Sequence, residues 1–135
     1  MRHQMARRIG AAAAVAVAIL SVGIGLAQQP GFTRTELQRS DLSVPGREVV
    51  TVKIDFAPGG GVGRHTHFGE EVTYVIDGTV VLEIDGKEPR VMRAGEVAVI
   101  PAGVVHAAHV PEGAPAHALA NYIVEKGKPL ATPVK

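Results

Sequence analysis

The sequence predicts an all-β protein, a sandwich or barrel of short strands, on three observations. Apolar and polar residues alternate with a period of two in several short runs after residue 45, as expected for strands that are buried on one face. Sixteen glycines and nine prolines among 135 residues indicate frequent turns. After Ala27 no stretch carries an uninterrupted helical pattern of ordinary length. The length favours a single domain.

The first residues have the layout of an export signal. Three arginines within the first eight residues precede an uncharged, alanine-rich run over 9–26, and small residues near Ala27 suit a signal peptidase. We predict that residues 1–27 are a signal peptide and that the protein is periplasmic or secreted. An uncleaved membrane anchor is the alternative, because 18 uncharged residues are borderline for spanning about 30 Å of hydrocarbon. The adjacent Arg7 and Arg8 leave the Sec and twin-arginine routes both open.

The charge of the remaining chain excludes several classes of function. Without the three leader arginines, 11 basic residues (14 − 3) face 13 acidic ones, a net charge of about −2. A nearly neutral body without a basic run argues against a nucleic-acid partner. The absence of cysteine excludes disulfides, thiolate metal ligands and cysteine nucleophiles.

The expected strands follow one another between turns. Residues 28–46 form an N-terminal arm, with an edge strand over Thr33–Arg39. Glu48–Phe56 has the clearest period-two pattern and predicts a half-buried strand. Residues 126–135 are expected to form a C-terminal tail. The other predicted strands are Val72–Ile76, Thr79–Ile84, Arg90–Arg93, Glu96–Ile100, Val104–Val110 and Ala116–Val124.

Two Asp-Gly dipeptides predict tight hairpins. Asp77-Gly78 follows the strand expected at Val72–Ile76, and Asp85-Gly86 follows the next one. Both positions of a tight hairpin turn require positive φ, which Asp and Gly tolerate.

Three histidines and one glutamate have the spacing of a metal site. His65 and His67 are two residues apart, so an extended segment directs both to the same face. Glu71 lies four residues further, at the start of the next strand, and His106 follows a Pro-Ala-Gly turn. A lone histidine in a strand is more often a core or surface residue than a ligand, but this combination favours a ligand set. It suits divalent manganese, iron, nickel, copper or zinc and leaves coordination positions for water, oxygen or substrate.

These residues resemble the two sequence motifs of the cupins. The first motif, G-x5-H-x-H-x3-E-x6-G, is matched from Gly59 to Gly78 with every interval kept. The second, G-x5-P-x-G-x2-H-x3-N, is matched from Gly95 to His106 and has Val110 in place of asparagine. The asparagine is not a ligand in that family, so its replacement leaves the metal site intact.

The resemblance implies a single antiparallel jelly-roll barrel, the cupin barrel, over residues 47–125. It also implies one divalent metal ion per chain, with iron or manganese favoured and nickel, zinc and copper as the other candidates. The implied ligands are His65, His67, Glu71 and His106.

Other polar residues have weaker claims to a function. Glu70 is the rival to Glu71 but points to the opposite face of its strand. His109 is expected on the surface, and the direction of His117 stays open. Arg64 is either a surface residue or a contact for an anionic substrate at the mouth of the barrel. Five further side chains are expected to pack the barrel: Phe56, Phe68, Tyr74, Met92 and Tyr122.

The function that follows is an exported, metal-binding cupin. Our first interpretation is a metal-dependent enzyme of oxygenase or oxidoreductase type, such as a dioxygenase, that acts on a small organic acid or another oxygenated compound. A divalent ion beside one carboxylate keeps a charge of about +1, which favours an anionic ligand. The alternatives are a non-catalytic metal-dependent module that binds a small ligand and, third, a metal-free structural barrel.

The resemblance also suggests a homodimer, with Gly31–Asp41 as a candidate contact. We expect contact with a membrane only through an uncleaved leader.

Overall fold

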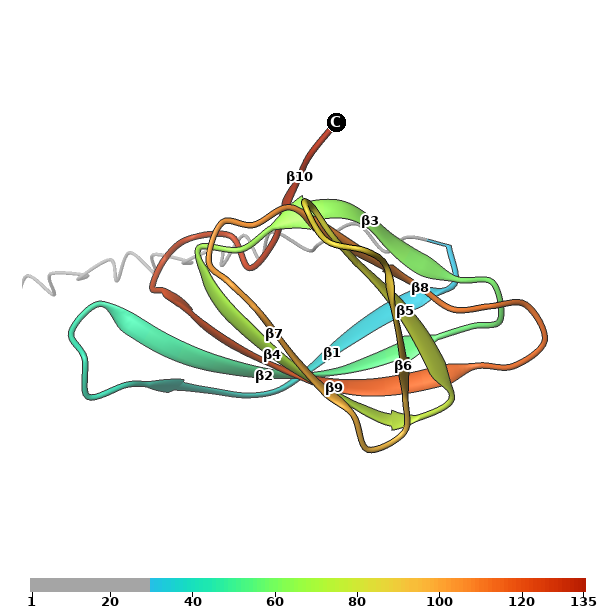
Figure 1. Ribbon diagram of the computed structural model, residues 1–135. Coiled ribbons are helices and arrows are strands. Elements are labelled where there is room, and N and C mark those ends of the chain that lie inside the picture. Colours follow the sequence, from blue (N-terminus) through green and yellow to red (C-terminus); the bar gives the residue numbers. More distant parts are fainter. Residues whose placement is uncertain (1–29) are drawn as a thin grey trace, which may run out of the picture.

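The computed structural model describes residues 30–135, which form two facing antiparallel sheets of five strands each (Figure 1). The predicted leader, residues 1–27, lies outside the described residues. No helix long and apolar enough to cross a membrane occurs among residues 30–135. The strands are β1 (Phe32–Asp41), β2 (Arg47–Phe56), β3 (Gly61–Thr66), β4 (Gly69–Asp77), β5 (Thr79–Ile84), β6 (Arg90–Arg93), β7 (Val97–Ile100), β8 (His106–His109), β9 (Ala116–Glu125) and β10 (Thr132–Pro133).

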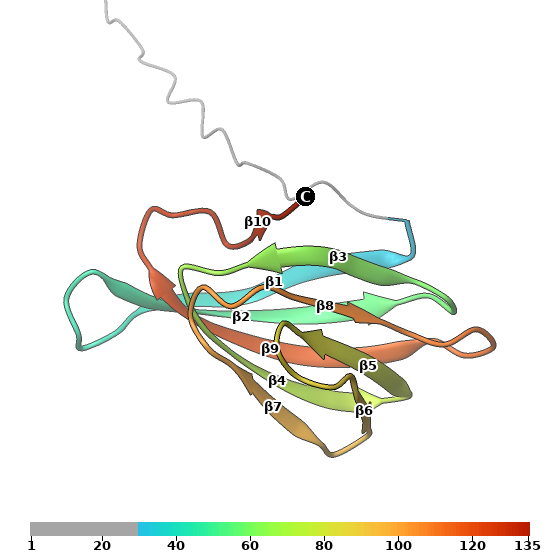
Figure 2. The same ribbon diagram turned by 45° about the horizontal axis from the view of Figure 1, so that its top comes forward.

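The chain passes repeatedly from one sheet to the other. One sheet has the order β1-β2-β9-β4-β7, and the other has the order β10-β3-β8-β5-β6. From β2 onward, consecutive strands therefore lie in different sheets, with the β5–β6 hairpin as the exception. Figure 2 shows the resulting two-layer barrel from a second direction. This arrangement confirms the prediction of an all-β jelly roll.

The core lies between the two sheets, and β2 and β9, paired neighbours inside their sheet, supply much of it. Every second residue of each strand is buried, as the period-two pattern of the sequence predicts. Phe56 and Ile54 of β2 pair with Ala116 and Ala118 of β9. Bulky side chains thus stand beside small ones on the inner face, and this leaves interior space that the opposite sheet only partly fills.

The two tight hairpins predicted at Asp-Gly dipeptides are both wrong. β4 and β5 lie in different sheets, so Asp77-Gly78 is a crossing between sheets. Gly78 has a φ of +75°, and a Cβ there would lie 2.5 Å from the Pro115 carbonyl oxygen. β5 and β6 do form a hairpin, but their pairing ends at Leu82–Arg90, so Asp85-Gly86 belongs to a longer loop. Among residues 30–135 only glycines have positive φ, whereas a tight hairpin turn of this kind needs positive φ at both central residues.

Two strands were not predicted because their residues lack alternating hydrophobicity. β3, with the sequence GVGRHT, follows the glycine-rich segment that we expected only to break the chain. Its strand conformation comes from pairing with β8. β10 lies within the predicted C-terminal tail and pairs with the end of β3, at Thr132–Thr66 and Pro133–His65.

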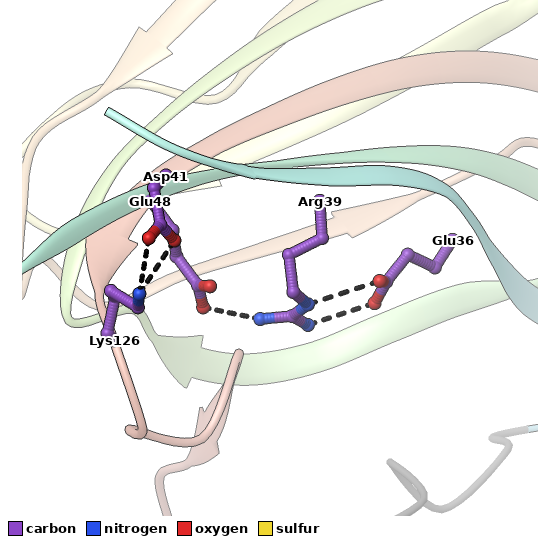
Figure 3. Close-up of polar contacts among 5 residues, drawn as sticks. All are labelled: Glu36, Arg39, Asp41, Glu48 and Lys126. Atoms are coloured by element: carbon purple, nitrogen blue, oxygen red, sulfur yellow. Dashed lines mark hydrogen bonds and ion pairs between the residues drawn. The ribbon is translucent and has the colours of Figure 1, made fainter. Parts of the chain in front are cut away.

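Polar contacts hold the far end of β1, which is the edge strand of its sheet (Figure 3). Arg39 donates hydrogen bonds to both carboxylate oxygens of Glu36, at 3.1 and 2.9 Å, and contacts the buried carboxylate of Glu48 on β2. The hydrogen bonds to Glu36 raise the pKa of Arg39. Lys126 lies 2.7 Å from Asp41 and ties the segment after β9 to the same end. Exposed pairs of this kind contribute little stability individually, but together they fix β1 against β2.

Candidate metal centre

The four predicted ligands come together inside the barrel. His65 lies on β3, His67 directly after it, Glu71 on β4 and His106 on β8. One ligand atom from each residue lies within 4.8 Å of the others, and all four residues are at most 6% exposed. The cluster thus joins residues from both sheets, because β4 belongs to one sheet while β3 and β8 belong to the other.

Backbone pairing explains this convergence. β3 and β8 are neighbours with His65 opposite His106, and the two ring centroids are 4.2 Å apart. Gly69 starts β4 in close contact with β9, where a Cβ would lie 1.9 Å from the Ile123 carbonyl oxygen. This glycine therefore allows the approach that places Glu71 opposite Tyr122 in the register of β4 and β9.

Each imidazole is held at Nδ1 by a backbone carbonyl. His65 Nδ1 lies 2.7 Å from the Gly63 oxygen, His106 Nδ1 lies 2.9 Å from the Val104 oxygen, and His67 Nδ1 lies 2.5 Å from the Leu130 oxygen. A carbonyl can only accept a hydrogen bond, so we assign the proton of each neutral ring to Nδ1. Nε2 of all three rings is then a lone pair available to a ligand, as in histidines that bind metal ions.

Glu71 supplies a carboxylate to the same centre. Its Oε2 lies 2.9 Å from His67 Nε2 and 3.2 Å from His106 Nε2, and its Oε1 accepts a 2.7 Å hydrogen bond from the Thr73 hydroxyl. Burial alone would raise the pKa of this carboxyl, but His106, His67 and Thr73 outweigh it and hold the pKa well below its usual range. Burial lowers the pKa of His65 to about 4, so this ring is neutral at pH 7.

A cation fits this arrangement. Nε2 of the three rings and the Glu71 carboxylate face one another in a buried space. His67 Nε2 is buried and has no hydrogen-bond partner. Buried acceptors without a donor are costly, and a divalent ion bound by nitrogen and oxygen ligands would satisfy all four at once.

The other polar candidates lie outside the cluster. Glu70 is exposed on the outer face of β4. His109 is exposed and lies 3.3 Å from Glu83. His117 lies 2.6 Å from Asp77 on the outer face of β9. Arg64 is on the surface, where its guanidinium donates two hydrogen bonds to Asp85, at 2.7 and 2.8 Å.

The packing role expected for five side chains holds for three of them. Phe56, Met92 and Tyr122 are buried, but Tyr74 and Phe68 are 42% and 39% exposed. Tyr74 is exposed because it lies on the outer face of β4, between inward-facing Thr73 and Val75.

A small cavity of about 30 Å³ adjoins the cluster. Its polar lining includes His65, Glu71, His106, Thr73, Tyr122 and Arg34, and most of its other walls are aliphatic or aromatic. Sequence reasoning treated Tyr122 only as packing and did not consider Arg34. The sequence contains one signal for the direction of the Arg34 side chain. Arg34 is two residues from Phe32, so in a strand both side chains lie on the same face, and Phe32 is buried.

Comparisons with known proteins agree with this site and fold. The sequence model of the cupin domain matches residues 52–122. An oxalate oxidase, solved in complex with the substrate analogue glycolate, is 28% identical, with a TM-score of 0.63 over 78% of this chain and 56% of its own. The chain therefore spans only about half the length of that protein. No curated protein matches the sequence.

Two more distant structures share the fold alone. A cupin superfamily protein from Desulfitobacterium hafniense DCB-2 is 20% identical, with a TM-score of 0.60 over 73% of this chain and 83% of its own. KdgF from Halomonas sp. is 22% identical, with a TM-score of 0.60 over 73% of this chain and 84% of its own. With more than half of the sequence matched by the domain model and the jelly roll present, the chain belongs to the cupin family.

Proposed function

We propose that this cupin is a metal-dependent enzyme of oxidoreductase type that acts on a small organic acid or another small oxygenated compound. The observation that carries this proposal is the set of four buried acceptor atoms, drawn from two sheets, that face one another beside a cavity. A purely structural barrel would gain nothing from burying three histidines and a glutamate here, because apolar side chains of similar volume fill a core without the cost of desolvating polar groups.

The proposed ligands of one divalent ion are His65, His67, Glu71 and His106, with iron or manganese favoured. When bound, such an ion supplies redox chemistry and open coordination positions for oxygen or substrate atoms. The protein contributes the rest. The backbone carbonyls fix the three rings, the Thr73 hydroxyl orients the Glu71 carboxylate, and the apolar cavity walls exclude bulk water from the reacting centre.

The comparison with oxalate oxidase supports a small acid as the substrate class. That protein was solved with glycolate and is 28% identical to this chain. Because the match covers only part of it, its activity remains a proposal for this protein.

The test combines metal analysis with turnover. Protein purified from cells supplied with iron and manganese should contain about one metal ion per chain, measured by mass spectrometry. Oxygen consumption should then rise with one of a panel of small acids, catechols and diketones. His65→Ala should lose both the metal and the activity, whereas His109→Ala, a histidine outside the cluster, should keep both. Metal and ligand binding without turnover would instead identify a binding module. Activity that survives loss of the metal in His65→Ala would disprove the mechanism.

We also propose that the protein is exported and dimeric. Export predicts that protein recovered from the periplasm or medium starts at Gln28, which N-terminal sequencing would measure.

For the dimer we favour the outer face of β4 and β7, where Tyr74, Val97 and Val99 are 42%, 47% and 58% exposed and lie on neighbouring strands. The alternative segment, Gly31–Asp41, has a mostly polar sequence.

A further inference from the structure

Arg34 is a half-buried arginine whose side chain reaches the cavity inside the barrel. It lies on β1 and is paired with Ile54 of β2, whose side chain is buried in the core. Paired residues on antiparallel strands point to the same side of the sheet, so Arg34 also points inward. It lines the same cavity as His65, Glu71 and His106. Figure 2 shows β1 beside β2 at the edge of their sheet.

Within residues 30–135, no carboxylate neutralises this guanidinium. Arg34 Nε is buried and has no hydrogen-bond partner. The guanidinium carbon lies 4.7 Å from the centre of the Phe32 ring, and Tyr122 lines the same cavity. By contrast, Arg39, Arg64 and Arg90 each pair with a carboxylate at the surface. An unpaired cation in a mostly apolar cavity is costly, and an anion in the cavity would remove that cost.

The chemistry of the cavity limits what this anion can be. A guanidinium presents two parallel N–H donors that match the two oxygens of a carboxylate. A cavity of about 30 Å³ has room for roughly two or three water-sized groups. Arg34, Tyr122, Glu71 and His106 line this one cavity, and the Tyr122 ring centroid lies 4.7 Å from that of His67. One small ligand therefore has access to the guanidinium at one end and to the four-residue cluster at the other.

We infer that Arg34 binds the carboxylate of the ligand and makes the cavity selective for the smallest carboxylates, those of one or two carbons. This inference rests on the proposed function, because it assigns the substrate class of the same site. A divalent ion with Glu71 keeps a charge of about +1, and Arg34 adds another. The cavity therefore attracts an anion more strongly than the metal centre alone would.

Calorimetry on Zn²⁺-loaded protein tests the inference without turnover. Acetate and glycolate should bind to the wild type, while acetamide, which is neutral and nearly the same shape as acetate, should bind at least tenfold more weakly. Arg34→Gln should weaken acetate and glycolate binding by tenfold or more and leave the zinc content at the wild-type level. Arg64→Gln is the matched control, since it removes an arginine whose carboxylate partner is at the surface, and its affinities should equal those of the wild type.

A second variant and a metal-free arm keep the test decisive. If Arg34→Gln does not fold, Arg34→Lys retains the charge but loses the two-point geometry, and it should bind acetate several-fold more weakly than the wild type. Protein treated with EDTA should gain thermal stability from acetate over chloride at equal ionic strength, and the Arg34 variant should not. This result would support the inference even if the purified protein contains no metal and the proposed function fails. Wild-type acetate affinity in a folded Arg34 variant, or equal binding of acetate and acetamide, would overturn it.

Discussion

Thr73 is expected to strengthen metal binding although it does not touch the metal. Its hydroxyl donates a 2.7 Å hydrogen bond to Glu71 Oε1, and both side chains point inward from β4. Thr73→Val removes this donor and keeps nearly the same shape. A hydrogen bond to a charged group contributes about 1.5–3 kcal/mol, and removing a partner that orients a metal ligand costs roughly 10–100-fold in metal affinity. The two ranges agree, since each tenfold change corresponds to about 1.4 kcal/mol.

Competition with a fluorescent zinc chelator measures this affinity directly. Thr51→Val is the control, because Thr51 is equally buried, at 8% exposure, but donates its hydroxyl hydrogen to Asn121, away from the cluster. It should lower the free energy of unfolding without changing the zinc affinity. If Thr73→Val binds zinc as tightly as the wild type while Thr51→Val behaves as expected, the claim that the Thr73 hydroxyl orients the Glu71 carboxylate for metal binding is wrong.

Three further predictions concern the pH dependence, the packing and the assembly. Between pH 6.5 and about 4 the unfolded chain protonates His65 while the folded metal-free protein does not, so its stability should fall by roughly 3 kcal/mol as the pH is lowered through this window. Urea titrations should show this loss in the wild type and not in His65→Gln; equal losses would contradict it. Gly69→Ala forces a Cβ against the Ile123 carbonyl, 1.9 Å away, so it should cost about 3 kcal/mol or more and lower the melting temperature by roughly 10 °C or more; an unchanged melting temperature would refute this close packing. Val99→Lys should convert a dimer to a monomer in light scattering, and a variant of wild-type mass would exclude the β4–β7 face.

The sequence predicted the metal cluster more reliably than the strand connections. The cluster depends on residue types at fixed intervals, and parity along a strand was enough to group His65 with His67 and to separate Glu70 from Glu71. The connections depend on which strands pair, and that is set by contacts between distant residues. The local sequence at Asp77-Gly78 therefore predicts a hairpin, although this dipeptide connects two different sheets.

Arg34 was missed for a related physical reason. In sequence, an arginine within a polar edge strand is typical of a solvent-exposed face. Its shared parity with Phe32 was the one hint in the sequence, and the pairing of β1 with β2 opposite Ile54 establishes its inward direction. Arg64 next to His65 was the more obvious candidate, yet successive residues of a strand point to opposite faces, so the neighbour of an inward-facing histidine points outward.

The position of the cluster couples binding to the integrity of the barrel. A divalent ion held by His65 and His106 from one sheet and by Glu71 from the other would link the two layers directly. His67 extends this link to the C-terminal segment, because its ring is held by the Leu130 carbonyl just before β10, the strand that pairs with β3 beside His65. Without the ion, the two sheets are joined at this point only by the contacts of Glu71 with His67 and His106. The residues proposed to bind the ion therefore also determine how tightly the barrel closes around the cavity.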